Sequence, residues 1–393
     1  MCGGRDRPGA DLDGNGNEQG HVMRQRLWAG LAVVALAGAS TAWAEDVAIA
    51  LGGPITGQYA SFGEQLRRGA EAAIADINAK GGVLGHPLTL VIGDDACDPK
   101  QAVAVANQLV SRKVVMVDGH WCSSSAIPAS AIYADAGVLM VSPGASNPLL
   151  TDGAAKKGWT NVFRTYGRDD AQGVYAGKYL AQHYAGHKVA IVDDKSAYGK
   201  GVADETRKAM NQAGLKEVLS ESVTQGDKDF SALVSKLKQA GIDVIYYGGY
   251  HTEAALIIRQ ARDQGLQAQL VSDDALVTDE FWSIAGEAGA GTLMTFSPDP
   301  RSVPAAKEVV QRLEAKGVNP EGYTLYSYAA VQVFAEGAEK AKSLAEDKIS
   351  AALKDGSAYE TVLGPLSFDA KGDVKNPQYI FYVWKGGKYE PVS

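Results

Sequence analysis

The chain has 393 residues, a formal net charge of −8 and 46% hydrophobic residues. An acidic chain of this kind has no electrostatic footprint for nucleic acids or anionic membranes, which bind clustered basic residues. Its length exceeds what one hydrophobic core usually supports, so we expect two domains.

Residues 23–44 have the pattern of an export signal. Arg24 and Arg26 form a basic start, Leu27–Ala37 is mostly apolar, and Ala42–Ala44 has the small-x-small pattern that signal peptidase recognises. The apolar run is shorter than the roughly 20 residues that a membrane-spanning helix needs. We therefore expect this segment to be cleaved and the remainder to be exported.

Residues 1–22 precede this signal and are polar, glycine-rich and without periodicity. Because an export signal normally stands at the start of a chain, the simplest interpretation is a misassigned start site, with translation beginning at Met23. A disordered extension is the alternative. In either case these residues do not belong to the folded domains.

From Glu45 onward, short apolar runs alternate with segments of helical period. This alternation is typical of parallel sheets covered by helices. The first series has predicted strands at Val47–Leu51, Leu88–Ile92, Val114–Val117 and Leu139–Val141, and predicted helices at Gly63–Ala79 and Pro99–Arg112.

A second series of the same kind begins near Asp169. Two such arrays in a row indicate an α/β fold with two doubly wound, Rossmann-like lobes. The second series has predicted helices at Asp170–Tyr184, Gly201–Ala213, Phe230–Ala240 and Thr252–Gln264, and predicted strands at Val189–Val192, near Val218, at Val244–Tyr247 and at Leu270–Val271.

The tail departs from this alternation, with several predicted helices and few strands. Such a tail fits material that returns to complete the earlier lobes. Its predicted helices are Pro304–Lys316, Tyr323–Leu344 and Lys348–Lys354, and its late strand is Tyr379–Trp384.

Two cysteines, Cys97 and Cys122, follow the export signal. In an oxidising compartment an even pair favours one disulfide, and both cysteines lie just past predicted strand ends, where neighbouring loops can be bridged. A metal site that includes His120 is the alternative, although structural zinc usually takes four nitrogen or sulfur ligands.

Ligands of open α/β sheets bind beyond the carboxyl ends of the strands. Ser123–Ser125 stand there at a helix start, where hydroxyls and free N–H groups can hold a carboxylate. Asp274 offers a counter-charge to an ammonium group, and Tyr198 and Tyr250 could wall the ligand. Together these residues would hold a zwitterion; taken singly, each is also explained as a helix cap or as packing at a lobe edge.

The sequence offers little for an enzyme. It contains no G-x-S-x-G, H-E-x-x-H or P-loop motif. His251 and Glu253 could form a general acid–base pair, but a surface helix start explains them and is favoured. We expect a protein without catalytic activity and without a cofactor.

Five segments carry a more distinctive pattern: Ala75–Gly82, Asp94–Asn107, Gly119–Ser125, Tyr246–His251 and Gly364–Asp373. The most specific parts are Asp-Asp-Ala-Cys-Asp-Pro in the second segment and Cys-Ser-Ser-Ser in the third. In these segments the chain resembles the periplasmic leucine/isoleucine/valine-binding proteins of ABC importers, which are type I solute-binding proteins. The resemblance spans essentially all of the chain after the export signal.

The resemblance implies two lobes that are joined by a three-strand hinge and close over a ligand. It also implies an inner-membrane ABC permease as partner. The Ala42–Ala44 pattern predicts cleavage after Ala44, and we expect a monomer in the periplasm. The implied boundaries are 45–166 plus 298–378 for the N-terminal lobe and 169–295 plus 381–393 for the C-terminal lobe, with hinge positions near Tyr166, Ser297 and Tyr379.

For the first lobe, the resemblance implies a disulfide between Cys97 and Cys122 and half of a ligand site. The serine directly after the second cysteine binds the ligand carboxylate in this family, and here it is Ser123. The small residue and the hydroxyl of the next loop, here Gly144 and Ser146, also contribute.

In the second lobe, the family's two site tyrosines match Tyr198 and Tyr250, and its acidic partner for the ammonium group falls on Asp274. Three positions differ from the branched-chain binders: Asp274 replaces Glu, Phe62 replaces Tyr, and Trp121 replaces Leu beside the ligand serine. An indole at Trp121 should fill part of the side-chain pocket, unless it merely packs against the disulfide.

We therefore expect a binding protein for a small or branched aliphatic amino acid, such as alanine, proline, valine or γ-aminobutyrate. A binding protein for an amide or an aromatic acid is one alternative, and a ligand-sensing receptor module is another. A secreted α/β enzyme is less favoured, because the strand-end loops lack a nucleophile or a metal set.

Overall fold

The structure, a computed structural model, describes residues 45–392. The predictions for residues 1–22 and for the export signal at 23–44 lie outside the described residues. Between residues 45 and 392, no helix combines the length and the apolar character that crossing a membrane requires.

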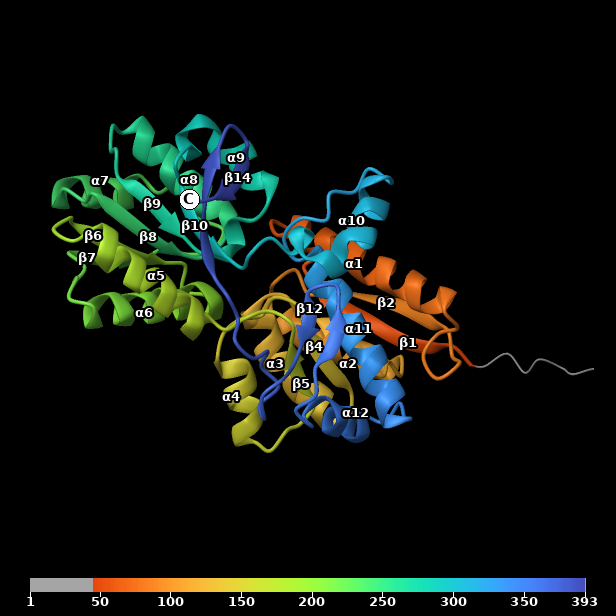
Figure 1. Ribbon diagram of the computed structural model, residues 1–393. Coiled ribbons are helices and arrows are strands. Elements are labelled where there is room, and N and C mark those ends of the chain that lie inside the picture. Colours follow the sequence, from red (N-terminus) through yellow and green to blue (C-terminus); the bar gives the residue numbers. More distant parts are fainter. Residues whose placement is uncertain (1–44, 393) are drawn as a thin grey trace, which may run out of the picture. The chain divides into compact units, whose positions relative to one another are not determined.

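The first lobe is built on a five-stranded parallel sheet with helices on both faces (Figure 1). In sheet order, its strands are β2 (Leu88–Asp94), β1 (Val47–Gly53), β3 (Met116–Gly119), β4 (Leu139–Ser142) and β5 (Val162–Arg164). Its helices are α1 (Ala60–Ala79), α2 (Pro99–Ser111), α3 (Ser123–Ala136) and α4 (Leu149–Lys156), joined by α10 (Lys307–Glu314), α11 (Thr324–Ala341) and α12 (Glu346–Leu353) from the tail.

Successive residues of β1 face opposite sides of this sheet, as the pleat of a strand requires. Ile49 packs in a hydrophobic cluster with Ala73 of α1 and Leu325 of α11. Its neighbour Ala50 packs in a different cluster, which includes Val105 of α2. Because helices cover both faces, the strands are continuous apolar runs in the sequence rather than alternating ones.

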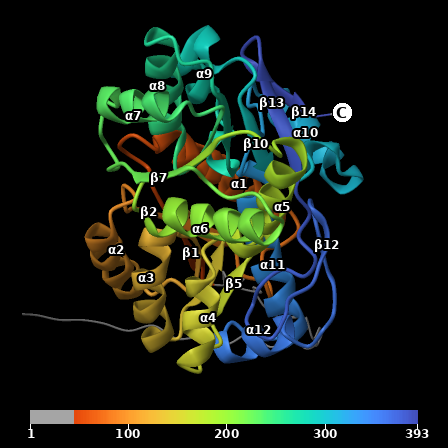
Figure 2. The ribbon, with the colours of Figure 1, turned by 90° about the vertical axis from the view of Figure 1, so that its left-hand side faces the viewer.

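The second lobe is built on a seven-stranded sheet (Figures 1 and 2). In sheet order, its strands are β14 (Lys388–Pro391), β13 (Ile380–Lys385), β10 (Leu293–Phe296), β9 (Gln269–Ser272), β8 (Val244–Gly248), β6 (Val189–Asp193) and β7 (Leu219–Ser222). The strands from β6 to β10 pair in parallel, whereas β13 and β14 pair antiparallel at one side.

Helices cover this second sheet on both faces as well. Figure 1 shows α5 (Asp169–His183) and α6 (Ala197–Gln212) on one face, where they share a hydrophobic cluster with β6 and β8. The other face carries α7 (Ser231–Ala240), α8 (His251–Asp263) and α9 (Asp279–Ala285), whose apolar side chains belong to another cluster.

The chain passes between the two sheets three times. It leaves the first sheet after β5, returns after β10, and leaves again before β13. Tyr166, Ser297 and Tyr379 lie at these three passages, and the ring centres of Tyr166 and Tyr379 are 6.2 Å apart. A two-stranded antiparallel pair, β11 (Tyr359–Thr361) and β12 (Gly364–Leu366), precedes the third passage.

The predicted two-lobed α/β fold is confirmed, although several short elements were not predicted. Strand β5 has three residues and ends in the charged Arg164, and β10 has four residues, of which Thr295 is polar. Neither segment is the long apolar run that marks a strand in a sequence. The tail contributes four strands, β11 to β14, where the sequence predicted only the segment that forms β13.

Candidate functional site

The predicted ligand residues lie on loops and helix starts that follow strands of both sheets. In the first lobe, Trp121 and Ser123 follow β3, Gly144 and Ser146 follow β4, and Phe62 lies on α1. All five belong to the buried part of the lobe.

In the second lobe, Tyr198 lies in the first turn of α6, Tyr250 follows β8, and Asp274 begins a short 3₁₀ turn after β9. These side chains are buried as well. The two sets meet, because the ring centres of Tyr250 and Trp121 are 5.6 Å apart and those of Tyr250 and Tyr198 are 5.2 Å apart.

The start of α3 has no side-chain cap. Its N-cap residue is Cys122, which makes no side-chain capping hydrogen bond and instead forms a disulfide with Cys97, with the two Cα atoms 5.6 Å apart. The first N–H groups of a helix have no partner within the helix, so they attract a carboxylate or another anion. Ser123 is the first helical residue rather than the cap, and its Oγ accepts a hydrogen bond from the Asn147 N–H (3.2 Å).

The residues of the alternative metal site are engaged elsewhere. Both cysteines belong to the disulfide. The buried His120 ring bonds through Nδ1 to Asp95 Oδ2 (2.5 Å) and through Nε2 to the Tyr133 hydroxyl (2.8 Å). The predicted disulfide is therefore confirmed, and His120 acts as a buried link between β3 and α3.

Asp274 is the centre of the second half of the site. Its Oδ1 accepts hydrogen bonds from the Tyr198 hydroxyl and from Gln172 Nε2, each at 2.7 Å, and its Oδ2 accepts one from the Tyr323 hydroxyl. Burial raises the pKa of Asp274, whereas these three donors oppose the shift because they stabilise the carboxylate. The site thus holds a buried carboxyl group whose orientation is fixed by hydrogen bonds from three neutral side chains.

Trp121 forms one wall of the site. Its indole stacks on Phe62 with ring centres 4.0 Å apart and meets the Tyr323 ring edge-on at 5.4 Å. It also lies against Gly144, where an added Cβ atom would stand 2.1 Å from Trp121 Cδ1. The indole therefore fills the space beside Gly144, and it shares its hydrophobic cluster with the disulfide cysteines.

Several polar atoms around this wall are buried without a partner. Two of them, within residues 45–392, are Trp121 Nε1 and the Tyr250 hydroxyl. Buried polar groups in native proteins are usually bonded, because leaving one unpaired costs about 1–3 kcal/mol. Their convergence from two lobes marks this region as a place where a polar ligand can bind.

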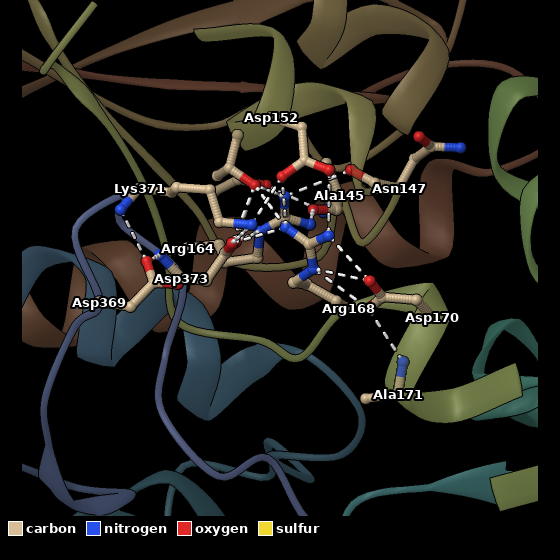
Figure 3. A network of polar contacts seen from close by, with 12 residues as sticks. Ala145, Asn147, Asp152, Arg164, Arg168, Asp170, Ala171, Asp369, Lys371 and Asp373 are labelled. Carbon is tan, nitrogen blue, oxygen red and sulfur yellow. Dashed lines mark hydrogen bonds and ion pairs between the residues drawn. The ribbon is translucent and has the colours of Figure 1, made fainter. Parts of the chain in front are cut away.

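Arg164 supports the loop that carries Ser146 (Figure 3). Its buried guanidinium donates from Nη1 to the Ala145 carbonyl (2.8 Å) and from Nη2 to the Asn147 carbonyl (3.2 Å). Asp373 balances the charge, with 2.7 Å between Arg164 Nε and Asp373 Oδ1. The backbone on both sides of Ser146 is thereby fixed to the end of β5.

A second arginine extends this network toward the first passage. Arg168 forms ion pairs with Asp152 (3.1 Å), Asp170 (2.8 Å) and Asp373 (2.7 Å), and Lys371 pairs with Asp152 at 2.7 Å (Figure 3). The charged groups therefore tie the first passage to the segment that leads to the third.

Asp169, the first residue of α5, lies next to the Ser146 loop. Its backbone N–H donates to the Ser146 carbonyl (3.0 Å). Burial raises the pKa of the Asp169 carboxyl to about 8, so this acid keeps its proton over most of the neutral range.

Two polar residues of the site were not predicted, Gln172 and Tyr323. Gln172 occupies a buried position in the first turns of α5, and Tyr323 directly precedes α11. Neither follows a strand of its own sheet, so the rule that located the other residues does not reach them.

The prediction that His251 and Glu253 stand at a surface helix start was wrong. Both side chains are fully buried at the start of α8. His251 Nε2 lies 2.9 Å from Glu280 Oε2, and Glu253 Oε1 accepts the Gly226 N–H at 2.8 Å. The two residues have separate partners, so no acid–base pair is formed.

Two α/β lobes with a polar site at their strand ends are typical of proteins that close around a small ligand. A family model described as "Periplasmic binding protein" matches residues 46–388. Leu/Ile/Val-binding protein homolog 1 of Brucella melitensis is 50% identical over 375 residues, which cover 94% of this chain and 100% of the relative. The chain therefore belongs to the periplasmic binding protein family, and the resemblance found in the sequence is confirmed.

Further relatives and solved structures agree with this assignment. The leucine-, isoleucine-, valine-, threonine-, and alanine-binding protein of Pseudomonas aeruginosa is 44% identical over 372 residues, covering 93% of this chain and 97% of that protein. The structure of LivJ from Streptococcus pneumoniae in complex with isoleucine is 29% identical with a TM-score of 0.79, covering 88% of this chain and 99% of the other. The leucine binding protein LivK from Thermotoga maritima gives 27% identity and a TM-score of 0.80, covering 88% and 98%.

Proposed function

We propose that this protein binds a small or branched aliphatic amino acid between its two lobes and delivers it to an inner-membrane ABC permease. Alanine, proline, valine and γ-aminobutyrate are the ligands we favour. In this proposal the protein is exported by residues 23–44, loses them after Ala44, and acts as a monomer in the periplasm without catalysis. The named ligands of its relatives, which are branched-chain and small amino acids, support this ligand class.

One observation carries the proposal: hydroxyl groups of the first lobe and an acidic group of the second lobe belong to the same candidate site. Ser123 and Ser146 at the first lobe suit a carboxylate, whereas Asp274 at the second suits an ammonium group. A zwitterion held by both sets gains its full binding energy only when the lobes are together. The ligand would therefore shift the equilibrium toward the closed state.

The lobes in this proposal comprise residues 45–166 plus 298–378 and residues 169–295 plus 381–393. Closure would bend the chain at the three passages, near Tyr166, Ser297 and Tyr379. The proposed ligand residues are Phe62, Trp121, Ser123, Gly144, Ser146, Tyr198, Tyr250 and Asp274.

Trp121 supports the preference for small ligands. Its indole lies against Gly144 and stacks on Phe62, so it takes up room next to two of the proposed ligand residues. A slim side chain such as that of alanine or valine would fit beside the indole better than that of leucine.

A thermal-shift screen of the purified protein tests the proposal. The panel contains L-amino acids, γ-aminobutyrate, small amides, aromatic acids and sugars. A ligand at 1,000 times its Kd stabilises the folded state by about 4 kcal/mol, which is seen as a higher Tm. We expect large shifts with small aliphatic amino acids and weaker ones with leucine; shifts with amides or aromatic acids alone would refute the amino-acid assignment.

A further inference from the structure

Gln172 is a buried amide that connects three elements of the second lobe. It lies in the first turns of α5. Its Nε2 donates to Asp274 Oδ1 at 2.7 Å and to Thr295 Oγ1 at 2.9 Å. Asp274 follows β9, and Thr295 lies on the neighbouring strand β10. All three residues belong to one lobe, so their contacts do not depend on whether the two lobes are apart or together.

The two hydrogen bonds determine which way round the amide lies. A glutamine side chain has two N–H donors and one carbonyl acceptor, whereas a carboxylate oxygen can only accept. The opposite orientation would turn the Gln172 carbonyl toward the Asp274 carboxylate, and the two acceptors would repel each other. Gln172 Oε1 makes no hydrogen bond within residues 45–392. The hydrogen bonding of this amide is therefore directed at Asp274 and Thr295.

Gln172 also influences which oxygen of Asp274 a ligand can reach. Oδ1 accepts from Gln172 and from the Tyr198 hydroxyl, each at 2.7 Å, and these two donors use both acceptor positions of that oxygen. Oδ2 accepts from the Tyr323 hydroxyl and has one further position. An incoming ammonium group is thereby left with Oδ2.

The donors that surround the Asp274 carboxyl group carry no charge. In the part of the chain that the structure describes, they are the amide of Gln172 and the hydroxyls of Tyr198 and Tyr323. Buried charges in proteins are usually paired with an opposite charge. Because the protein surrounds this carboxylate with neutral donors, the ligand is the natural source of the positive partner.

We propose that Gln172 is a positioning residue that makes binding depend on an ammonium group in the ligand. Its amide orients the Asp274 carboxylate and leaves Oδ2 to the ligand, but it supplies no positive charge of its own. A carboxylic acid without an amine leaves Asp274 unpaired and so binds poorly. This role rests on the proposed function for the class of ligand, whereas the action of Gln172 on Asp274 can be measured without any ligand.

Other ionisable groups act on Asp274 as well. Burial raises its pKa, and hydrogen bonds from Tyr323, Tyr198 and Gln172 oppose this shift. The charges of two neighbouring acids, Asp169 and Asp273, interact with its charge. The other groups that face it are the tyrosines Tyr166, Tyr246, Tyr326 and Tyr379. All of these remain when Gln172 alone is replaced, so a change in the behaviour of Asp274 reports on the amide.

The first test follows the stability of Gln172→Met without ligand, by urea denaturation between about pH 4 and 8. Methionine keeps the length of the side chain but removes both donors. The loss of a donor raises the pKa of Asp274 in the folded state, so the folded variant retains a proton that the folded parent has released at the same pH. The stability lost relative to the parent should therefore grow as the pH rises and shrink as the pH falls.

Gln269→Met is the matched control for this test. Gln269 lies on β9 of the same sheet, and its amide donates to the carbonyls of Leu270 and Gly291, each at 2.7 Å. These acceptors do not titrate, so the stability lost in Gln269→Met should be the same at every pH.

The second test compares ligands with and without an amine by isothermal titration calorimetry: L-alanine against propionate, and L-valine against isovalerate. Gln172→Lys places a positive charge beside Asp274 and removes the need for one in the ligand. Because a hydrogen bond to a charged group is worth about 1.5–3 kcal/mol, the ratio of amino-acid to carboxylic-acid affinity should fall at least roughly tenfold. Gln269→Lys should keep the ratio of the parent, and circular dichroism shows which variants are folded.

A loss of stability in Gln172→Met that is the same at every pH would overturn the inference, as would an unchanged affinity ratio in folded Gln172→Lys. If Gln172→Lys does not fold, the first test decides. A loss that grows with pH, in a protein that binds neither amino acid, would support the role of Gln172 and count against the proposed ligand class. The failure of one proposal is thus distinguished from the failure of the other.

Discussion

Arg164 and Asp373 form a buried ion pair, with 2.7 Å between Arg164 Nε and Asp373 Oδ1. Arg164 ends β5 in the first part of the chain, whereas Asp373 belongs to the returning tail. The pair therefore fixes the tail to the first lobe at the point where the chain is about to cross to the second. The same arginine also bonds the backbone around Ser146.

Replacement of Asp373 by Ala should strongly destabilise the protein. It would leave the guanidinium of Arg164, whose side chain is 0% exposed, without its counter-charge. Removing one partner of a buried pair typically costs about 3–5 kcal/mol, because the other charge remains buried and unpaired. Urea denaturation at neutral pH measures the change in unfolding free energy.

The surface pair of Lys385 and Glu390 provides the control for this substitution. Its side chains are 64% and 57% exposed, so Glu390→Ala should change the unfolding free energy by no more than about 1 kcal/mol. Equal effects of the two substitutions would show that the buried pair has no special role in stability.

Replacement of Trp121 by Leu should widen the ligand preference toward leucine. The indole fills the space between Phe62 and Gly144, and removing it should open room for a larger aliphatic side chain. Because one methylene in a pocket is worth about 1–3 kcal/mol, the ratio of leucine to alanine affinity should rise at least roughly tenfold. Isothermal titration calorimetry with both amino acids gives this ratio, and an unchanged ratio would contradict the pocket-filling role of Trp121.

Gly144 should tolerate a side chain only when Trp121 is small. A Cβ atom at Gly144 would overlap the indole, so Gly144→Ala should destabilise the protein by about 1–3 kcal/mol. In the Trp121→Leu background the same change should cost much less. A double-mutant cycle of unfolding free energies tests this coupling, and additive effects would show that the two sites are independent.

The stability of the protein should fall as the pH rises toward 8, partly because of Asp169. Burial raises the pKa of this acid from 3.8 to about 8, so between these values the folded state binds a proton that the unfolded state has lost. The unfolding free energy then decreases with rising pH, by up to about 1.4 kcal/mol per pH unit for one proton. Asp194 and Glu321, whose pKa values burial raises to about 7, act in the same direction.

The substitution Asp169→Asn should reduce the fall of the unfolding free energy with pH by up to about 1.4 kcal/mol per pH unit, the slope that one bound proton contributes. Urea denaturation at about pH 5, 6 and 7 measures the slope for both proteins. Asp263→Asn is the control, because Asp263 is exposed on α8 and its replacement should leave the slope unchanged. A slope that is identical in Asp169→Asn and in the parent would show that Asp169 does not hold the extra proton.

The fold could be predicted where the sequence has long apolar runs or clear helical period. Strands β1 and β8 and helices α2 and α7 were located to within two residues, because both faces of the sheets are buried and the helices are amphipathic. The short β5 and β10 could not be located in this way. These segments are strands because they pair with neighbouring strands in the sheet. That pairing depends on the tertiary fold and not on the local sequence.

The residues proposed for the site followed from strand ends and from a family resemblance. These two sources did not predict all of the residues that hydrogen-bond to them. The partners of Asp274 illustrate the limit. Tyr198 follows β6, but Gln172 and Tyr323 come from helix starts on either side of the passages between the lobes. Their approach to Asp274 depends on how the chain passes between the two lobes, and local sequence patterns do not encode that geometry.

The discontinuous layout of the lobes also constrains the order in which the protein can fold. On the first sheet, the face that carries α1 is completed only by α11 and α12. The second sheet lacks strands β13 and β14 until the last residues of the chain are present. Neither half can complete its core from a continuous stretch of sequence, and contacts of such long sequence separation form slowly. Complete packing of either lobe therefore requires residues from nearly the whole polypeptide.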